Sequence, residues 1–202
     1  PRECTTKTLV TKSGTSMAAP AASGIISMVR QFFVDGWYPS ISKPSKEIAS
    51  QNNKLDDQNI PFTPSSTLLR AFAVNSAKKI DTLIATGFGV MNPYEGLGFT
   101  GVGLRLANQV YINSSQHQIF KITVQNSGSP LTVTLSYLDP PLPGSSNIPL
   151  FADLDLVVVT PSGKVHKGNG FENKLDEDQF ATTEKVIINK AEKGVFTIHI
   201  LS

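Results

Sequence analysis

Ser16 is the residue of this sequence whose type and setting most clearly suggest chemistry. It stands in the stretch SGTSMAAPAASG, residues 13–24, between Thr15 and Met17. A serine at the start of a helix can act as a nucleophile, because the helix N–H groups and the helix dipole would stabilise an oxyanion beside it. Gly14 would let a substrate approach closely, and the small residues after Ser16 would let the helix pack tightly. The alternative is an ordinary capping serine, since serine is a common helix cap.

A serine nucleophile needs a neighbouring base to take its proton. No histidine precedes Ser16 in the sequence. The three histidines, His117, His166 and His199, all lie in a later segment whose pattern predicts β-strands. His117 would lie at a strand entrance, and His199 on the outer face of a strand. We therefore expect none of the three to be catalytic.

Two helices are predicted in the first half of the chain. Residues 16–34 are apolar almost all round, which is typical of a buried helix. Pro20 lies near the first turn of this helix, where its missing N–H would not be used. Residues 65–77 predict the second helix, with Ser65 or Ser66 as its cap.

From about residue 118 the apolar residues alternate with polar ones, which predicts strands. Gly and Pro turn signals separate the segments 119–126, 131–137, 154–160, 185–189 and 195–201. Short alternating strands with such turns are typical of an antiparallel sandwich or jelly roll. The change of pattern places a domain boundary between residues 97 and 115.

The stretch Gly14–Pro20, GTSMAAP, matches the signature around the nucleophile of subtilisin-like serine proteases, and the chain resembles this family well beyond that motif. The further matching stretches are Phe33–Pro39, Thr63–Ser65, Leu68–Ala71, Asn75–Ala77, Gly87–Asn92 and Phe151–Val158. The branch of the family that the chain resembles carries a β-sandwich after the protease. The resemblance therefore implies an α/β fold, the C-terminal portion of a subtilisin-like catalytic domain, over residues 1–104. An all-β antiparallel sandwich or jelly roll would follow over residues 105–202.

The resemblance implies that Ser16 is the nucleophile of a serine endopeptidase, with Gly14 and Thr15 in the substrate and oxyanion region. In such enzymes the histidine and aspartate of the triad precede the serine, so an upstream part of the same protease would supply them. We expect the chain to be the C-terminal portion of a longer protein that acts on polypeptide substrates, and to be inactive alone. The chemistry would need no cofactor. The alternative is a non-catalytic fragment whose sandwich mediates adhesion or stabilisation.

The same hypothesis predicts the surroundings of the helix at residues 16–34. This helix is too apolar to stand in water, and its natural cover would be the upstream part of the protease. We therefore expect an exposed apolar surface around it, or a poorly ordered segment, unless another chain covers it.

Asp153 and Asp155 could contribute to a metal site. They lie two residues apart in a predicted strand, so their carboxylates would face the same side. Together with Asp139 or the acidic run at 176–178 they could bind a structural calcium ion through oxygen ligands. Calcium sites are frequent in the proteases that the chain resembles. The alternative is that Asp153 caps the strand and Asp155 makes local hydrogen bonds.

Trp37 and Tyr38 lie at the foot of a polar, Pro-rich stretch, residues 35–64, that predicts a long surface loop. They could line a substrate groove. Packing of the loop base against the domain is the role we expect.

Composition excludes several classes of protein. The net charge of +2 over 202 residues is too small to indicate nucleic-acid binding. No unbroken apolar run approaches the roughly 18 residues of a membrane span, so no membrane segment is expected in this chain. Cys4 is the single cysteine, which excludes an internal disulfide. The resemblance suggests a secreted or lumenal protein and leaves open a parent protein tethered to a membrane.

Overall fold

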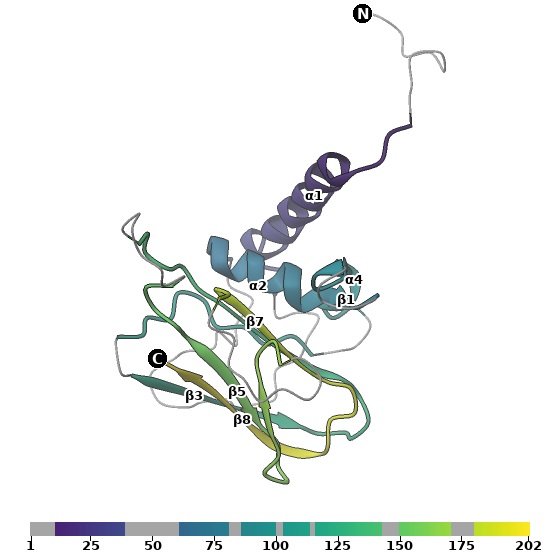
Figure 1. Ribbon diagram of the computed structural model, residues 1–202. Helices are drawn as coiled ribbons and strands as arrows, with labels where there is room; N and C mark the ends of the chain where they lie inside the picture. Colours follow the sequence, from purple (N-terminus) through teal and green to yellow (C-terminus); the bar gives the residue numbers. More distant parts are fainter. Residues whose placement is uncertain are drawn as a thin grey trace, which may run out of the picture.

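The computed structural model describes residues 11–38, 61–80, 86–99, 103–113, 116–142, 150–170 and 180–202. These residues combine helices with antiparallel sheets (Figure 1). Cys4, the acidic run at 176–178 and most of the predicted loop lie outside the described residues. The layout is compatible with the expected α/β segment followed by a sandwich, although many folds combine such elements.

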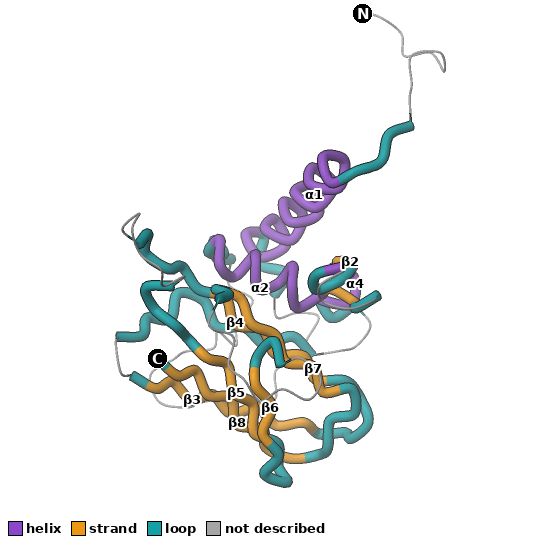
Figure 2. The backbone as a smooth tube through the Cα atoms, viewed as in Figure 1, coloured by secondary structure: helices purple, strands orange, loops and turns teal. Residues whose placement is uncertain are grey.

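Figure 2 colours the elements by type. The helices are α1 (Thr15–Val34), α2 (Ser66–Ser76) and α4 (Pro93–Gly96), and two short strands, β1 (Ala77–Lys78) and β2 (Val90–Met91), pair beside them. The remaining strands are β3 (His117–Val124), β4 (Leu131–Ser136), β5 (Asp155–Val159), β6 (Val165–Lys167), β7 (Thr183–Ile188) and β8 (Gly194–Leu201).

Both predicted long helices are confirmed. The second, α2, begins after Ser65, whose hydroxyl accepts a hydrogen bond from the Leu68 N–H at 3.1 Å. This is the cap that the sequence predicts. The first, α1, packs on α2 only through its C-terminal half, where Val29 and Phe33 are each 1% exposed. These two residues form a buried cluster with three others, Tyr38, Phe72 and Leu97.

The strands form two antiparallel sheets that enclose a common core. One sheet has the strand order β3-β8-β5-β6, and the other pairs β4 with β7. The core between them contains Leu156, Val158, Val186, Ala191, Phe196 and Ile198. All five predicted strands are confirmed to within a few residues, and the two-residue period explains why alternate side chains point inward. The strand β6 was not predicted, because three residues are too few to show a period.

The helix α2 lies on the outer face of the β4–β7 sheet, so one layer of helix covers the sandwich (Figure 1). The Arg70 guanidinium donates to the Ser136 hydroxyl at 2.7 Å. The Thr134 hydroxyl donates to the Asn75 side chain at 2.9 Å. These bonds join residues on opposite sides of the predicted boundary near residue 104, so the two segments share an interface. The boundary itself stays a prediction.

Lys185 is a buried lysine at this interface. Its side chain is 7% exposed and donates to the Val74 and Ala77 carbonyls at 2.7 and 2.8 Å. These carbonyls lie at the C-terminal end of α2, where a helix leaves acceptors without intrahelical donors. Burial lowers the pKa of Lys185 to about 8 from its ordinary 10.5. Charging this lysine in the folded protein therefore has an energetic cost.

This cost predicts how stability depends on pH. Between pH 8 and 10.5 the folded protein has released the Lys185 proton while the unfolded chain still holds it. Because the unfolded state binds more protons there, the contribution of Lys185 to the free energy of unfolding rises with pH across that window. Relative to a Lys185→Met variant, the wild type should therefore gain stability between pH 8 and 10.5. Urea denaturation of both proteins at several pH values measures this difference.

Lys193→Met is the control, because Lys193 is exposed and lies on the turn before β8. This variant reports the effect of removing an exposed lysine, with which the pH dependence of Lys185→Met is compared. A stability difference between Lys185→Met and the wild type that stays constant from pH 8 to 10.5 would contradict the burial of this lysine under α2.

Among the residues that the structure describes, one helix is long and apolar enough to cross a membrane by length and composition. This helix is α1, which spans 20 residues and is mostly exposed. The search for an unbroken apolar run missed it, because Arg30, Gln31 and several serines interrupt the run. Core helices of soluble proteins and signal sequences pass the same test, so this is weak support for a membrane span.

Candidate active site

Ser16 is the second residue of α1 and is exposed. Gly14 is the N-cap residue, with a φ of 143° that side chains rarely adopt. A Cβ at Gly14 would meet no atom within 4 Å, so the backbone conformation, and not crowding, requires glycine here. The N-terminal end of α1 points away from the sheets (Figure 1). The predicted site residues Gly14, Thr15 and Ser16 are thus adjacent and accessible.

The positive end of α1 is open. The Met17 and Ala18 N–H groups both donate to the Gly14 carbonyl, at 3.0 and 3.1 Å. Among the described residues no side chain caps this end, and the first turn has no acidic residue. Within the part of the chain that the structure describes, the Ser16 side chain makes no hydrogen bond, and its N–H is one of the donors that a helix start leaves unpaired. This end could therefore stabilise a negative charge next to the Ser16 hydroxyl.

Pro20 lies deeper in α1 than the sequence suggested. Because the helix begins at Thr15, Pro20 is inside it, at a position whose N–H would bond to the Ser16 carbonyl. The prediction that the missing N–H would be unused is therefore wrong. Proline leaves the Ser16 carbonyl without its helical donor, which loosens the turn that carries the hydroxyl.

The histidines lie in the sheets, as predicted. His117 begins β3, His199 lies in β8 and His166 lies in β6. The Nε2 of His117 and the Nδ1 of His199 are 2.8 Å apart, so these two rings share a hydrogen bond. The pKa of His199 is lowered mainly by burial and also by the charge of His117. The pKa of His166 is lowered mainly by burial and also by the charge of Lys164. The structure brings none of them to Ser16.

The N-terminal half of α1 exposes an apolar surface. Residues 15–21 are all exposed, as are Gly24 and Met28. Val29 and Phe33 are the residues of α1 that are buried. The expectation of an exposed apolar surface is therefore confirmed for this helix.

Asp153 and Asp155 do not lie on one strand face as predicted, because β5 begins at Asp155 and Asp153 precedes it. The Asp139 carboxylate instead accepts the Phe151 and Ala152 N–H groups, at 2.8 and 2.9 Å. Among the described residues, no three His, Cys, Asp or Glu side chains form a group that could hold a metal ion. The acidic run at 176–178 is outside that search, and a calcium site at Asp153 and Asp155 stays a prediction.

Sequence reasoning missed the role of Tyr137 near these carboxylates. Its hydroxyl donates to the Ala152 carbonyl at 3.0 Å and accepts from the Leu154 N–H at 3.4 Å. Burial raises the pKa of Tyr137 to about 12, and the charges of Asp153 and Asp139 also raise it. Tyr137 is the last residue of an alternating run, so only its tertiary contacts distinguish it from its neighbours.

The two aromatic residues that follow α1, Trp37 and Tyr38, have different surroundings. Tyr38 is 5% exposed and packs in the cluster with Phe33, which confirms packing at the loop base. Trp37 is 58% exposed and lines an open hollow together with Phe32. The sequence offered no means of separating these two neighbouring aromatic residues.

Comparison with known proteins supports a protease-related origin. No protein-family model matches the chain. A Dictyostelium discoideum protein named serine protease/ABC transporter B family protein tagD is 30% identical over 119 residues, which is 54% of this chain and 6% of that protein. A second protein of that organism, named serine protease/ABC transporter B family protein tagB, is 28% identical over 116 residues, which is 53% of this chain and 5% of that protein. The chain is similar to proteins named serine proteases. It spans about 6% of the length of tagD and 5% of that of tagB.

Proposed function

We propose that the chain is part of a subtilisin-like serine endopeptidase and that Ser16 is its nucleophile. The observation that carries this proposal is the GTSMAAP motif at the open N-terminal end of α1, where Ser16 is exposed. The names of the two similar proteins support it, since both include the words serine protease.

The chemistry begins at the Ser16 hydroxyl. A histidine base from an upstream segment would take its proton while the oxygen attacks the carbonyl carbon of a peptide bond. The N–H groups at the start of α1, with Gly14 and Thr15 beside them, would stabilise the oxyanion. The histidine would then give its proton to the leaving amine, and water would hydrolyse the acyl-enzyme. No cofactor takes part in these steps.

The exposed half of α1 fits this assignment. An apolar helix surface of this length requires a cover, and the segment that carries the histidine and aspartate would provide it. The sandwich, joined to α2 through Lys185 and Arg70, would hold the scaffold in place. We propose a secreted or lumenal location for the same protein.

A fluorophosphonate probe tests the proposal on the full-length protein that contains this chain. The wild type should be labelled, because the probe reacts with an activated serine, and Ser16→Ala should not. The control is Ser27→Ala, which removes another serine of α1 whose hydroxyl only donates to the Ser23 carbonyl at 2.9 Å. Labelling that survives Ser16→Ala would exclude Ser16 as the labelled nucleophile, and its absence from the wild type would favour a non-catalytic fragment; either result would overturn the proposal.

A further inference from the structure

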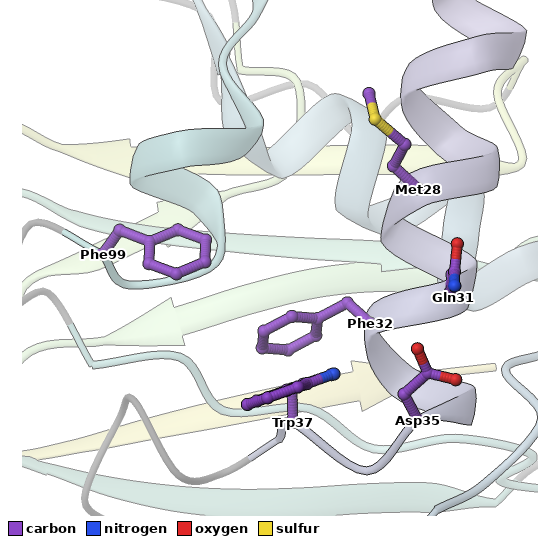
Figure 3. Close-up of a pocket in the computed structure, with 6 residues that line it drawn as sticks. All are labelled: Met28, Gln31, Phe32, Asp35, Trp37 and Phe99. Atoms are coloured by element: carbon purple, nitrogen blue, oxygen red, sulfur yellow. The ribbon is translucent and has the colours of Figure 1, made fainter.

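An open hollow lies at the C-terminal end of α1, at the opposite end of the helix from Ser16. Its volume is about 400 Å³, which is within the range of sites that bind small groups. The side chains of Met28, Gln31, Phe32, Asp35, Trp37 and Phe99 line it (Figure 3). With a rise of 1.5 Å per residue, Ser16 and Phe32 are about 24 Å apart along the helix axis. The hollow is therefore separate from the proposed nucleophile.

A tight chain reversal after α1 lies between two residues that line the hollow, Asp35 and Trp37. Gly36 has a φ of 74°, which turns the chain back on the helix. The Trp37 N–H then donates to the Phe32 carbonyl at 3.1 Å, and the Asp35 N–H donates to the Gln31 carbonyl at 2.8 Å. These bonds fix Trp37 and Asp35 beside Phe32.

The aromatic walls are held by ring contacts. Phe32 meets Phe99 edge to face, with centroids 6.3 Å apart. Phe99 in turn stacks on Tyr94, with centroids 5.4 Å apart and planes inclined by 15°. Trp37 is nevertheless 58% exposed and Phe99 47% exposed. Exposed aromatic rings can contact a cation, because the face of an aromatic ring carries negative potential.

Among the described residues that line the hollow, Asp35 is the one with a charged side chain. It lies at the C-terminal end of α1 and lines the same hollow as Phe32 and Trp37 (Figure 3). An anion next to aromatic faces is complementary to a planar cation, and the guanidinium of arginine can stack on a ring while it bonds to a carboxylate. The ammonium of lysine cannot stack in this way. We propose that the hollow binds an arginine side chain of a polypeptide partner.

Trp37 makes the proposal directly testable, because it is the single tryptophan of the chain. Its fluorescence can be titrated with the peptide acetyl-Gly-Arg-Gly-amide. The control peptide carries citrulline, which has nearly the shape of arginine but no charge. We expect a saturable change that is about three- to tenfold tighter for arginine and that weakens as salt rises. Equal affinity for the two peptides would overturn the proposal.

Variants locate the site. Asp35→Asn should bind the arginine peptide only as tightly as the citrulline peptide, and its affinity for the citrulline peptide should equal that of the wild type. The two proteins and two peptides together form a double-mutant cycle, which isolates the contact between the two charges. The matched control is Glu192→Gln, which removes one negative charge on a turn of the sheet segment and should leave both affinities unchanged. Phe99→Leu should weaken arginine binding, since it removes a ring face. A fluorescence change on protein dilution without peptide would show self-association and would also overturn the proposal.

The outcome is independent of the proposed catalysis. Ser16→Ala should bind the arginine peptide as the wild type does. Loss of probe labelling with intact arginine binding, or the reverse, would therefore separate the two proposals.

Discussion

Replacing Ser16 by alanine in the full-length protein is expected to lower kcat for peptide hydrolysis by about 10⁶-fold. The variant keeps the helix start, because Ser16 is exposed and alanine is a good helix former. It loses the oxygen that would form the acyl-enzyme, so hydrolysis falls to the residual rate that oxyanion stabilisation and substrate binding supply. Steady-state hydrolysis of a fluorogenic peptide measures the effect, with KM expected to change little.

Two controls make this result specific to the hydroxyl. Ser23→Ala alters a serine of the same helix, two turns away, and should retain activity. Circular dichroism and urea denaturation of Ser16→Ala should match the wild type, since the site is outside the core. Activity of Ser16→Ala within tenfold of the wild type would exclude an acyl-enzyme at this residue.

The sequence predicted most of the local structure, because local patterns determine it. The Ser65 cap and the helical period that begins after it located α2, and alternation located β3, β4 and β8. The strand β6 has too few residues for a pattern, and the entry of Pro20 into the helix depends on where α1 begins. Element boundaries are therefore the weakest part of such predictions.

Contacts between distant residues could not be predicted. Lys185 donates to Val74, 111 residues away, and its position in an alternating strand suggests an ordinary solvent-facing lysine. Asn169 similarly bonds β7 through its side chain, accepting from the Lys185 N–H at 3.0 Å and donating to the Thr183 carbonyl at 2.8 Å. The packing of α2 on the sheet gives the Lys185 side chain its partners, and the pairing of the segment at Asn169 with β7 gives Asn169 its own.

At the candidate site, too, the sequence predicts what is local and misses what several segments assemble. The GTSMAAP motif located Ser16 and the small residues after it, and the structure places that serine at an open helix end. The hollow beside Trp37 has no sequence motif, because its walls come from α1, from the turn at Gly36 and from Phe99. Motifs reveal chemistry that one short segment carries, whereas surfaces assembled from several segments require coordinates.

Phe33→Ala is expected to lower the free energy of unfolding by about 3–5 kcal/mol. Phe33 is 1% exposed. Its ring centroid lies 5.2 Å from that of Phe62, 5.9 Å from that of Tyr38 and 6.4 Å from that of Phe72. Truncation would therefore leave a cavity among several aromatic side chains, and it would remove the main contact between α1 and α2. Urea denaturation monitored by circular dichroism measures the loss.

Met28→Ala is the matched control, because Met28 lies on the same helix and is 64% exposed. It should change stability by less than about 0.5 kcal/mol. Hydrogen exchange should show where the loss acts: amides around Val29 and Phe33 should lose protection in Phe33→Ala. Amides at residues 15–25 should exchange quickly in both proteins, since this half of α1 has few tertiary contacts. A loss below about 1 kcal/mol would mean that α1 is not anchored through Phe33. Strong protection at residues 15–25 would mean that another part of the chain already covers the end of the helix that carries Ser16.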